Sequence, residues 1–253
     1  MASVDKVFHL IEVMTERSEP FGLTELARAA GLDKGTTHRL LESLIGHGYV
    51  TRTADSLYEL TLKLWTLGAR TVGRRSVVAQ VQPFLKKLAA LTGETVYLTI
   101  VDNLEAVYMA RIDSPHYLRP HTPIGGRVPL YCGSTGKALL AYLSDQEIKK
   151  VGKSLTAVTP RTITRYDVLL KELARIRAKG YATSVGEWDL SISGVAAPVF
   201  GSDGNVVASI GVTGPVDRLN ETSLTKLGPQ VAGVAWELSE QVGCPPSSRL
   251  RAQ

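Results

Sequence analysis

Two short amphipathic segments separated by a glycine constrain this chain more than any other feature. The first runs from Glu25 to Ala30 with Thr24 as a candidate N-cap, and the second starts at Asp33. Gly31 between them can take the left-handed backbone conformation that ends one helix and reverses the chain. Because each segment is apolar on one face, the two helices are expected to pack across this turn. The pattern predicts a helix-turn-helix unit.

The residues on either side extend this unit into a small domain. Residues 4–14 form an expected helix with Ser3 as a candidate N-cap, because their apolar side chains recur at helical spacing. Residues 50–60 are strand-like at both ends around the polar triplet 54–56, which predicts a hairpin. A hairpin directly after the second helix is typical of a winged helix-turn-helix.

The second helix is the candidate DNA-reading element. Lys34, Thr36 and the backbone amides at its start can hold phosphate. Arg39 can donate to guanine, and His38 can reach a phosphate or a base. Arg52 on the hairpin can reach a neighbouring phosphate or the minor groove. The expected DNA-contacting residues are Lys34, Gly35, Thr36, Thr37, His38, Arg39, Ser43 and Arg52.

A purely structural interpretation of the same region stays open. Helix pairs with a polar outer face also occur as packing modules, and Glu42 on the reading face repels phosphate unless it accepts from a cytosine amine. Total charge does not separate the two interpretations, because residues 1–75 contain ten Lys or Arg and nine Asp or Glu. DNA binding by this region must therefore depend on a few placed groups.

Length and composition favour two domains. The chain has 253 residues, of which 44% are hydrophobic and 21% charged, which is enough to bury a sizeable core. A helix expected over residues 61–72, followed by Gly73, Arg74 and Arg75, marks the best connection. The expected parts are a winged helix-turn-helix at 1–62, a linker helix at 63–78, a second domain at 79–247 and a tail at 248–253.

The second domain is expected to be an antiparallel sheet flanked by helices. Asp102 and Asn103 form a candidate turn between two strand-like runs, which indicates a hairpin. The expected strands are 96–101, 106–112, 181–185, 192–200 and 206–213. The expected helices are 135–143, 168–179, 224–242 and one that carries Phe84, Leu85 and Leu88, with Pro83 at or near its first turn. Hairpins combined with flanking helices indicate the α+β class.

Several classes of protein are disfavoured. Cys132 and Cys244 lie far apart and the five histidines have no metal-ligand spacing, so we expect no disulfide, metal or cofactor. Signal-peptide and membrane-span patterns are lacking, so we expect a cytoplasmic protein without a membrane partner. The run from Gly133 to Lys137 fails the phosphate-loop pattern at both ends and no GxSxG occurs. We therefore expect no enzyme and no catalytic residue, with Cys132 as a small buried side chain.

Ser134 is a candidate N-cap for the helix expected from Thr135. The amides of Thr135 and Gly136 at the start of that helix can hold a carboxylate or another polar ligand group. A cap that serves only the helix is the alternative, and it is the more frequent role of such a serine.

Ordered stretches of the sequence resemble one family of bacterial transcriptional regulators, the IclR family. The stretches similar to its winged helix-turn-helix are Gly31–Leu44, Gly48–Val50 and Tyr58–Leu60. Those similar to its effector domain are Thr92–Val96, Gly133–Ala141 and Gly194–Val199. The resemblance implies a winged helix-turn-helix joined by a linker helix to a GAF-like antiparallel α/β effector domain.

The resemblance also implies a small-molecule pocket. Its positions fall on Ser134, Thr135, Ser184, Gly194, Gly211 and Thr213. Trp188, Leu190 and Ile192 are candidate apolar walls, which core packing explains equally well, and Glu187 is either a hydrogen-bond acceptor for the ligand or an ordinary surface charge. Several family members have larger or more polar groups in place of Gly194 and Gly211. We therefore expect a roomier, less polar pocket for an aromatic or acyl compound.

The leading hypothesis is a transcriptional regulator, with repression favoured. It would bind roughly palindromic operator DNA as a dimer or tetramer, and a small effector would change the spacing of two winged helices through the helix at 61–72. The alternative is a metabolite-binding module or an enzyme whose helical segment serves protein association.

Overall fold

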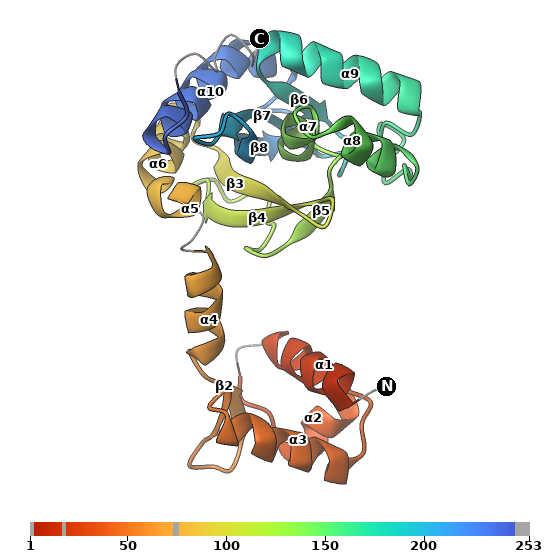
Figure 1. Cartoon of the computed structure of the whole chain (residues 1–253), viewed down its shortest axis with the longest axis vertical. Helices are drawn as coiled ribbons and strands as arrows, with labels where there is room; N and C mark the ends of the chain where they lie inside the picture. Colours follow the sequence, from red (N-terminus) through yellow and green to blue (C-terminus); the bar gives the residue numbers. More distant parts are fainter. Residues whose placement is uncertain (1–2, 17–18, 73–75, 246–253) are drawn as a thin grey trace. The chain divides into compact units, whose positions relative to one another are not determined.

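The protein consists of two compact units, Met1–Arg74 and Arg75–Gln253. A computed structural model describes residues 3–16, 19–72 and 76–245 (Figure 1). The expected tail at 248–253 and the connection through Gly73, Arg74 and Arg75 lie outside the described residues.

The first unit is a three-helix domain followed by a hairpin and one more helix. Its elements are α1 (Ser3–Thr15), α2 (Leu23–Ala29), α3 (Lys34–Gly46), β1 (Val50–Arg52), β2 (Tyr58–Leu60) and α4 (Lys63–Val72). Leu10, Leu26 and Leu41, one from each of the first three helices, are completely buried together. Tyr58 of β2 joins this core and bridges to Phe21 before α2. The predicted winged helix-turn-helix is confirmed.

The turn between α2 and α3 has the expected backbone, whereas two predicted caps are wrong. Gly31 has a φ of 61°, and Asp33 caps α3 by accepting the Thr36 amide at 2.8 Å. Thr24 lies inside α2. The N-cap residue of this helix is Gly22, which has no side chain that could accept a hydrogen bond from the helix amides. Ser3 is likewise the first helical residue of α1 and not a residue before it.

The second unit contains one six-stranded antiparallel sheet in the order β5-β4-β3-β8-β7-β6. The strands are β3 (Thr95–Asp102), β4 (Glu105–Ile112), β5 (Arg127–Pro129), β6 (Ala182–Val185), β7 (Ile192–Phe200) and β8 (Val206–Pro215). The helices are α5 (Ser76–Gln80), α6 (Gln82–Thr92), α7 (Ser134–Leu140), α8 (Asp145–Gly152), α9 (Tyr166–Lys179) and α10 (Glu221–Gln241). The predicted α+β class is confirmed, although the short elements α5, β5 and α8 had no expected counterpart.

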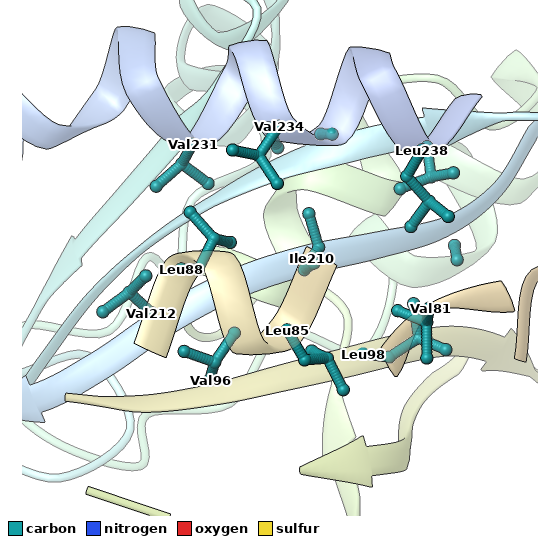
Figure 2. Packing of buried hydrophobic residues seen from close by; sticks show 14 of the residues in the cluster. Val81, Leu85, Leu88, Val96, Leu98, Ile210, Val212, Val231, Val234 and Leu238 are labelled. Carbon is teal, nitrogen blue, oxygen red and sulfur yellow. The ribbon is translucent and has the colours of Figure 1, made fainter. Parts of the chain in front are cut away.

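Helices cover both faces of the sheet, with α6 and α10 on one face and α7, α8 and α9 on the other (Figure 1). On the first face, Leu85 and Leu88 of α6 and Val231 and Leu238 of α10 belong to one buried apolar cluster with residues of β3 and β8 (Figure 2). Alternate strand residues supply the floor of this core, because successive side chains of a strand point to opposite faces. The opposite face of the sheet is covered by α7, with α8 and α9 beside it.

Candidate functional site

The outer surface of α3 carries most of the expected DNA-contacting residues. Lys34, Gly35, His38, Arg39 and Ser43 are exposed and Thr36 is half-buried. The first five are therefore available to a partner that approaches this side of α3. Arg52 at the end of β1 is also exposed, with its guanidinium 5.7 Å from the centre of the Tyr58 ring.

Thr37 is the exception, and its expected contact with DNA is wrong. Its side chain is completely buried and its hydroxyl donates to the Asp33 carbonyl at 3.0 Å. Helical spacing puts Thr37 on the same face as Leu41 and Leu44, so including it among the DNA contacts conflicted with the periodicity.

Two contacts orient the exposed side chains of α3. His38 Nε2 lies 3.7 Å from Glu42 Oε1 one turn later, an ion pair when the imidazole is protonated. The Arg39 guanidinium lies at 3.5 Å from the Thr36 hydroxyl, at the long limit of a hydrogen bond. Glu42 is thus placed beside His38, and Arg39 is held only weakly along the helix.

The second unit contains a cavity on the sheet face that α7 covers, with a volume of about 40 Å³. Seven of the ten expected pocket residues line it, namely Ser134, Thr135, Ser184, Trp188, Ile192, Gly194 and Thr213. Among the described residues that line it, none carries a charged side chain, whereas hydroxyl groups and aromatic rings are abundant. The cavity can therefore offer hydrogen bonds and apolar contact, but no direct countercharge from a lining residue.

Tyr97 and Tyr108 also line the cavity, and the sequence did not single them out. The register of β3 against β4 shifts between Leu98 and Thr99, and this bulge brings the two tyrosine rings to a centroid distance of 4.6 Å. Burial raises the pKa of the Tyr108 phenol to about 12, so it stays protonated and can donate a hydrogen bond. Strand periodicity alone cannot locate such a bulge.

The expectation of a roomy pocket at the two glycines is wrong. A Cβ on Gly194 would lie 2.8 Å from the Ser134 hydroxyl, and one on Gly211 would lie 2.6 Å from the Ala196 Cβ. Thr135 also stands only 3.0 Å from that Gly211 position. The glycines thus let α7 lie close against the sheet, and the space that a larger side chain would need is already filled.

Three expected pocket residues do not line the cavity: Glu187, Leu190 and Gly211. Gly211 lies beneath Thr135, and Leu190 is 55% exposed at the surface. Glu187 is instead buried in an ion pair, with its carboxylate 2.5 Å from the ammonium of Lys137. Both interpretations offered for Glu187, a ligand acceptor and an ordinary surface charge, are replaced by this structural role.

Lys137 is an interior lysine, 1% exposed on a helix whose seven residues are all buried. It also lies 3.2 Å from Glu172 of α9, which Arg175 contacts from the surface. Burial opposes ionisation of Glu172, but hydrogen bonding and charge from Arg175 and Lys137 keep its pKa below the usual value. Burial dominates at Glu187 and raises its pKa despite Lys137.

Glu187 also fastens the loop between β6 and β7 to its surroundings. Its carboxylate accepts the Gly133 amide at 3.4 Å, and its carbonyl accepts from the Thr162 hydroxyl at 2.7 Å and the Cys132 thiol at 3.1 Å. Burial and the Glu187 charge raise the pKa of Cys132 to about 12, so the thiol stays protonated. Cys132 is a small buried side chain, as expected from the sequence, and it also lines the cavity.

The expected N-cap at Ser134 is wrong by one position. Gly133 is the N-cap residue, with a φ of 84°, and Ser134 is the first helical residue of α7. The Ser134 side chain thus remains available to line the cavity. No group of three or more His, Cys, Asp or Glu residues in the described part of the chain is placed to hold a metal ion.

Comparison with known families assigns both units. Residues 3–54 match the IclR helix-turn-helix domain, and residues 69–240 match the bacterial transcriptional regulator IclR C-terminal domain. The chain belongs to the IclR family. Regulators of this family are DNA-binding transcription factors that respond to small effectors, and the two units correspond to those two tasks.

Individual IclR-family relatives are similar to this chain over nearly its full length. The HTH-type transcriptional regulator KdgR of Escherichia coli strain K12 is 34% identical over 246 residues, covering 96% of this chain and 93% of its own. The crystal structure of the Thermotoga maritima IclR has a TM-score of 0.84 at 27% identity and covers 95% of this chain and 98% of its own.

A more distant IclR homologue, from Microbacterium hydrocarbonoxydans, was crystallised in complex with 4-hydroxybenzoate. It shares the fold with a TM-score of 0.81 at 21% identity, covering 95% of this chain and all of its own. Within the described part of this IclR-family chain, no helix combines the length and apolar character needed to cross a membrane.

The close packing of α7 against the sheet predicts that one added methyl group will destabilise the protein. We expect Gly211→Ala to lower the free energy of unfolding by about 1 to 3 kcal/mol, because its Cβ would overlap Ala196 and crowd Thr135. Gly233→Ala in α10 is the matched control, since no atom lies within 4 Å of its added Cβ. That change should stabilise the protein by about 0.5 to 1 kcal/mol. Urea unfolding measures both, and equal stability of the two variants would contradict the close contact.

Proposed function

We propose that this IclR-family protein binds operator DNA through the outer face of α3 and the β1–β2 hairpin, under the control of a small organic effector in the cavity beside α7. The observation that carries this proposal is the set of exposed polar and basic groups on α3 next to an inner face packed into the core of the domain. A helix with this division can enter a major groove without unpacking its own domain.

Each group on the reading face has a separate task in this proposal. Lys34 at the start of α3 contacts phosphate, where the helix dipole also favours negative charge. Arg39 lies more than one turn further along α3 and reads guanine with its guanidinium. Gly35 between them has no side chain, so the backbone can approach the DNA closely. Arg52 on the hairpin contacts a neighbouring phosphate or the minor groove.

The protein acts as a dimer or tetramer on a roughly palindromic operator in this proposal. Two winged helices bind two half-sites, so their separation sets the fit to the DNA. The effector changes operator affinity through this separation, with a coupling free energy of about 1 to 3 kcal/mol. Repression in the bacterial cytoplasm, by occupation of promoter DNA in the absence of effector, is the regulatory outcome we propose.

The cavity supports an effector-binding role and no enzymatic one. Its thiol and one phenol, on Cys132 and Tyr108, are both kept protonated by burial, so neither is an activated nucleophile. The hydroxyls of Ser134, Ser184 and Thr213 are suited to bind a compact compound with hydrogen-bonding oxygens. An aromatic acid such as the 4-hydroxybenzoate bound by the Microbacterium homologue would require the cavity to widen.

The division of tasks on α3 predicts different behaviour of two variants. Arg39→Ala should weaken binding to the operator upstream of its own gene by about 1 to 3 kcal/mol and relax the preference for that sequence. Lys34→Ala should weaken specific and random DNA about equally and reduce the salt dependence of binding by about one phosphate contact. Fluorescence anisotropy at several salt concentrations measures both effects.

Lys149→Ala, on an exposed position of α8, is the control for general loss of positive charge. If Arg39→Ala discriminates operator from random DNA as well as the wild type does, the reading role of Arg39 is wrong. If every variant and the wild type bind the two DNAs equally, sequence-specific binding itself is wrong.

The assignment of the effector cavity predicts a loss of ligand response in two variants. A thermal-shift screen of small hydroxy, oxo and aromatic acids, 4-hydroxybenzoate included, identifies compounds that raise the melting temperature of the wild type. Thr213→Val removes a lining hydroxyl at nearly constant volume, and Gly194→Val places side-chain atoms against Ser134. We expect both to abolish the shift. An undiminished shift in both variants would place the effector elsewhere.

A further inference from the structure

The effector cavity has one wall made of irregular chain, the strap, defined here as residues 115–124 between β4 and β5. Pro120 and Thr122 of the strap line the cavity beside Tyr97. Within the strap, whose residues are all described, only Pro120 is buried. Its large apolar side chains Tyr117 and Leu118 are 101% and 67% exposed, so apolar packing contributes little to holding it in place.

Hydrogen bonds from the sheet and from Arg218, in the turn after β8, hold the middle of the strap. The Tyr97 hydroxyl accepts the Thr122 amide at 3.2 Å and donates to the Pro120 carbonyl at 3.5 Å. Arg111 of β4 donates to the Thr122 carbonyl at 2.8 Å, and Arg218 donates to the Leu118 carbonyl at 2.9 Å. Tyr97 differs from the two arginines because it is 1% exposed and its ring is itself a wall of the cavity.

The opposite walls of the cavity are fixed by close packing. Gly194 and Gly211 leave no room between α7 and the sheet, and the Ser209 hydroxyl of β8 donates to the Thr135 carbonyl at 3.0 Å. Lys137 and Glu187 hold the start of α7 and the loop that carries Trp188. A cavity of about 40 Å³ has room for only about three water molecules, so a larger ligand must displace a wall. The strap is the wall with the weakest attachment.

We propose that Tyr97 is a positioning residue for the effector site. Its hydroxyl holds the strap over the cavity and thereby closes the site. The proposal rests on the assignment of this cavity as the effector site. A ligand enters when the Tyr97 contacts to Pro120 and Thr122 open, and the ring of Tyr97 stays in place beside Tyr108. The Tyr97 hydroxyl therefore limits the access and the size of the ligand by holding the strap, and not by binding the ligand itself.

The experiment uses the thiol of Cys132, which lines the cavity, as a reporter of access. Full-length protein is treated with excess N-ethylmaleimide, and mass spectrometry of peptides follows labelling of Cys132 and of Cys244 separately. Tyr97→Phe keeps the ring and removes both hydrogen bonds to the strap. We expect Cys132 to react about two- to tenfold faster, because the bond to the Thr122 amide contributes a modest net stabilisation of the closed state and the 3.5 Å contact to Pro120, at the long limit of a hydrogen bond, adds little. Cys244, in a separate buried cluster, should react at the wild-type rate.

Hydrogen exchange in the absence of ligand supplies an independent readout. In Tyr97→Phe the Thr122 amide loses its acceptor, so peptides covering residues 115–124 should exchange faster. Peptides from the strands of the sheet should exchange at the wild-type rate. Arg111→Gln removes another anchor of the strap, without touching the ring, and should accelerate Cys132 labelling as well. Tyr181→Phe, the same chemical change in the core on the other face, should leave both readouts at wild-type values.

Three results would overturn the proposal: unchanged Cys132 labelling in both Tyr97→Phe and Arg111→Gln, equal acceleration at Cys244, or unchanged exchange of the strap in Tyr97→Phe. Operator binding by the same preparations tests the proposed function separately. Faster labelling and strap exchange in a protein that fails to bind operator DNA would reject the regulatory role and retain the positioning role of Tyr97.

Discussion

The buried ion pair between Lys137 and Glu187 is the interaction on which the proposed effector cavity depends. An ammonium group removed from water is strongly destabilising unless charge and hydrogen bonds compensate it, and Glu187 at 2.5 Å and Glu172 at 3.2 Å do so here. The pair joins the first turn of α7 to the loop that places Trp188 in the cavity wall. A charge pair specifies this arrangement in a way that apolar contacts, which tolerate sliding, do not.

The two units illustrate two ways to place function on a folded scaffold. On α3 the groups proposed to contact DNA are exposed, and the buried face only has to hold the helix in place. The number of charges matters less than their position, because the first 75 residues are nearly neutral overall. In the second unit the proposed effector site is a cavity beneath α7, so packing itself decides its shape. Coupling between the two requires that a ligand in the cavity favours one spacing of the winged helices over another.

The periodicity of apolar residues was sufficient to predict most of the regular elements, the winged helix and the class of the second domain. It was also sufficient to separate the exposed face of α3, where we propose the DNA contacts, from the buried face, with Thr37 the one residue assigned to both faces. It failed where a single tertiary contact decides the outcome. Gly194 and Gly211 indicated space when considered alone, but α7 fills that space. Glu187 and Tyr97 acquire their roles from partners about 50 and 25 positions away, Lys137 and Thr122, which no local pattern connects.

The most direct test of this account is the urea unfolding of Lys137→Met beside the exposed control Lys149→Met. We expect Lys137→Met to lower the free energy of unfolding of the second unit by about 3 to 5 kcal/mol at pH 7, and Lys149→Met to change it by less than about 0.5 kcal/mol. The pKa of Glu187 is already raised in the folded protein, so the deficit should shrink as the pH falls and this carboxylate takes up a proton. A Lys137→Met protein as stable as the control at pH 7 would contradict the account.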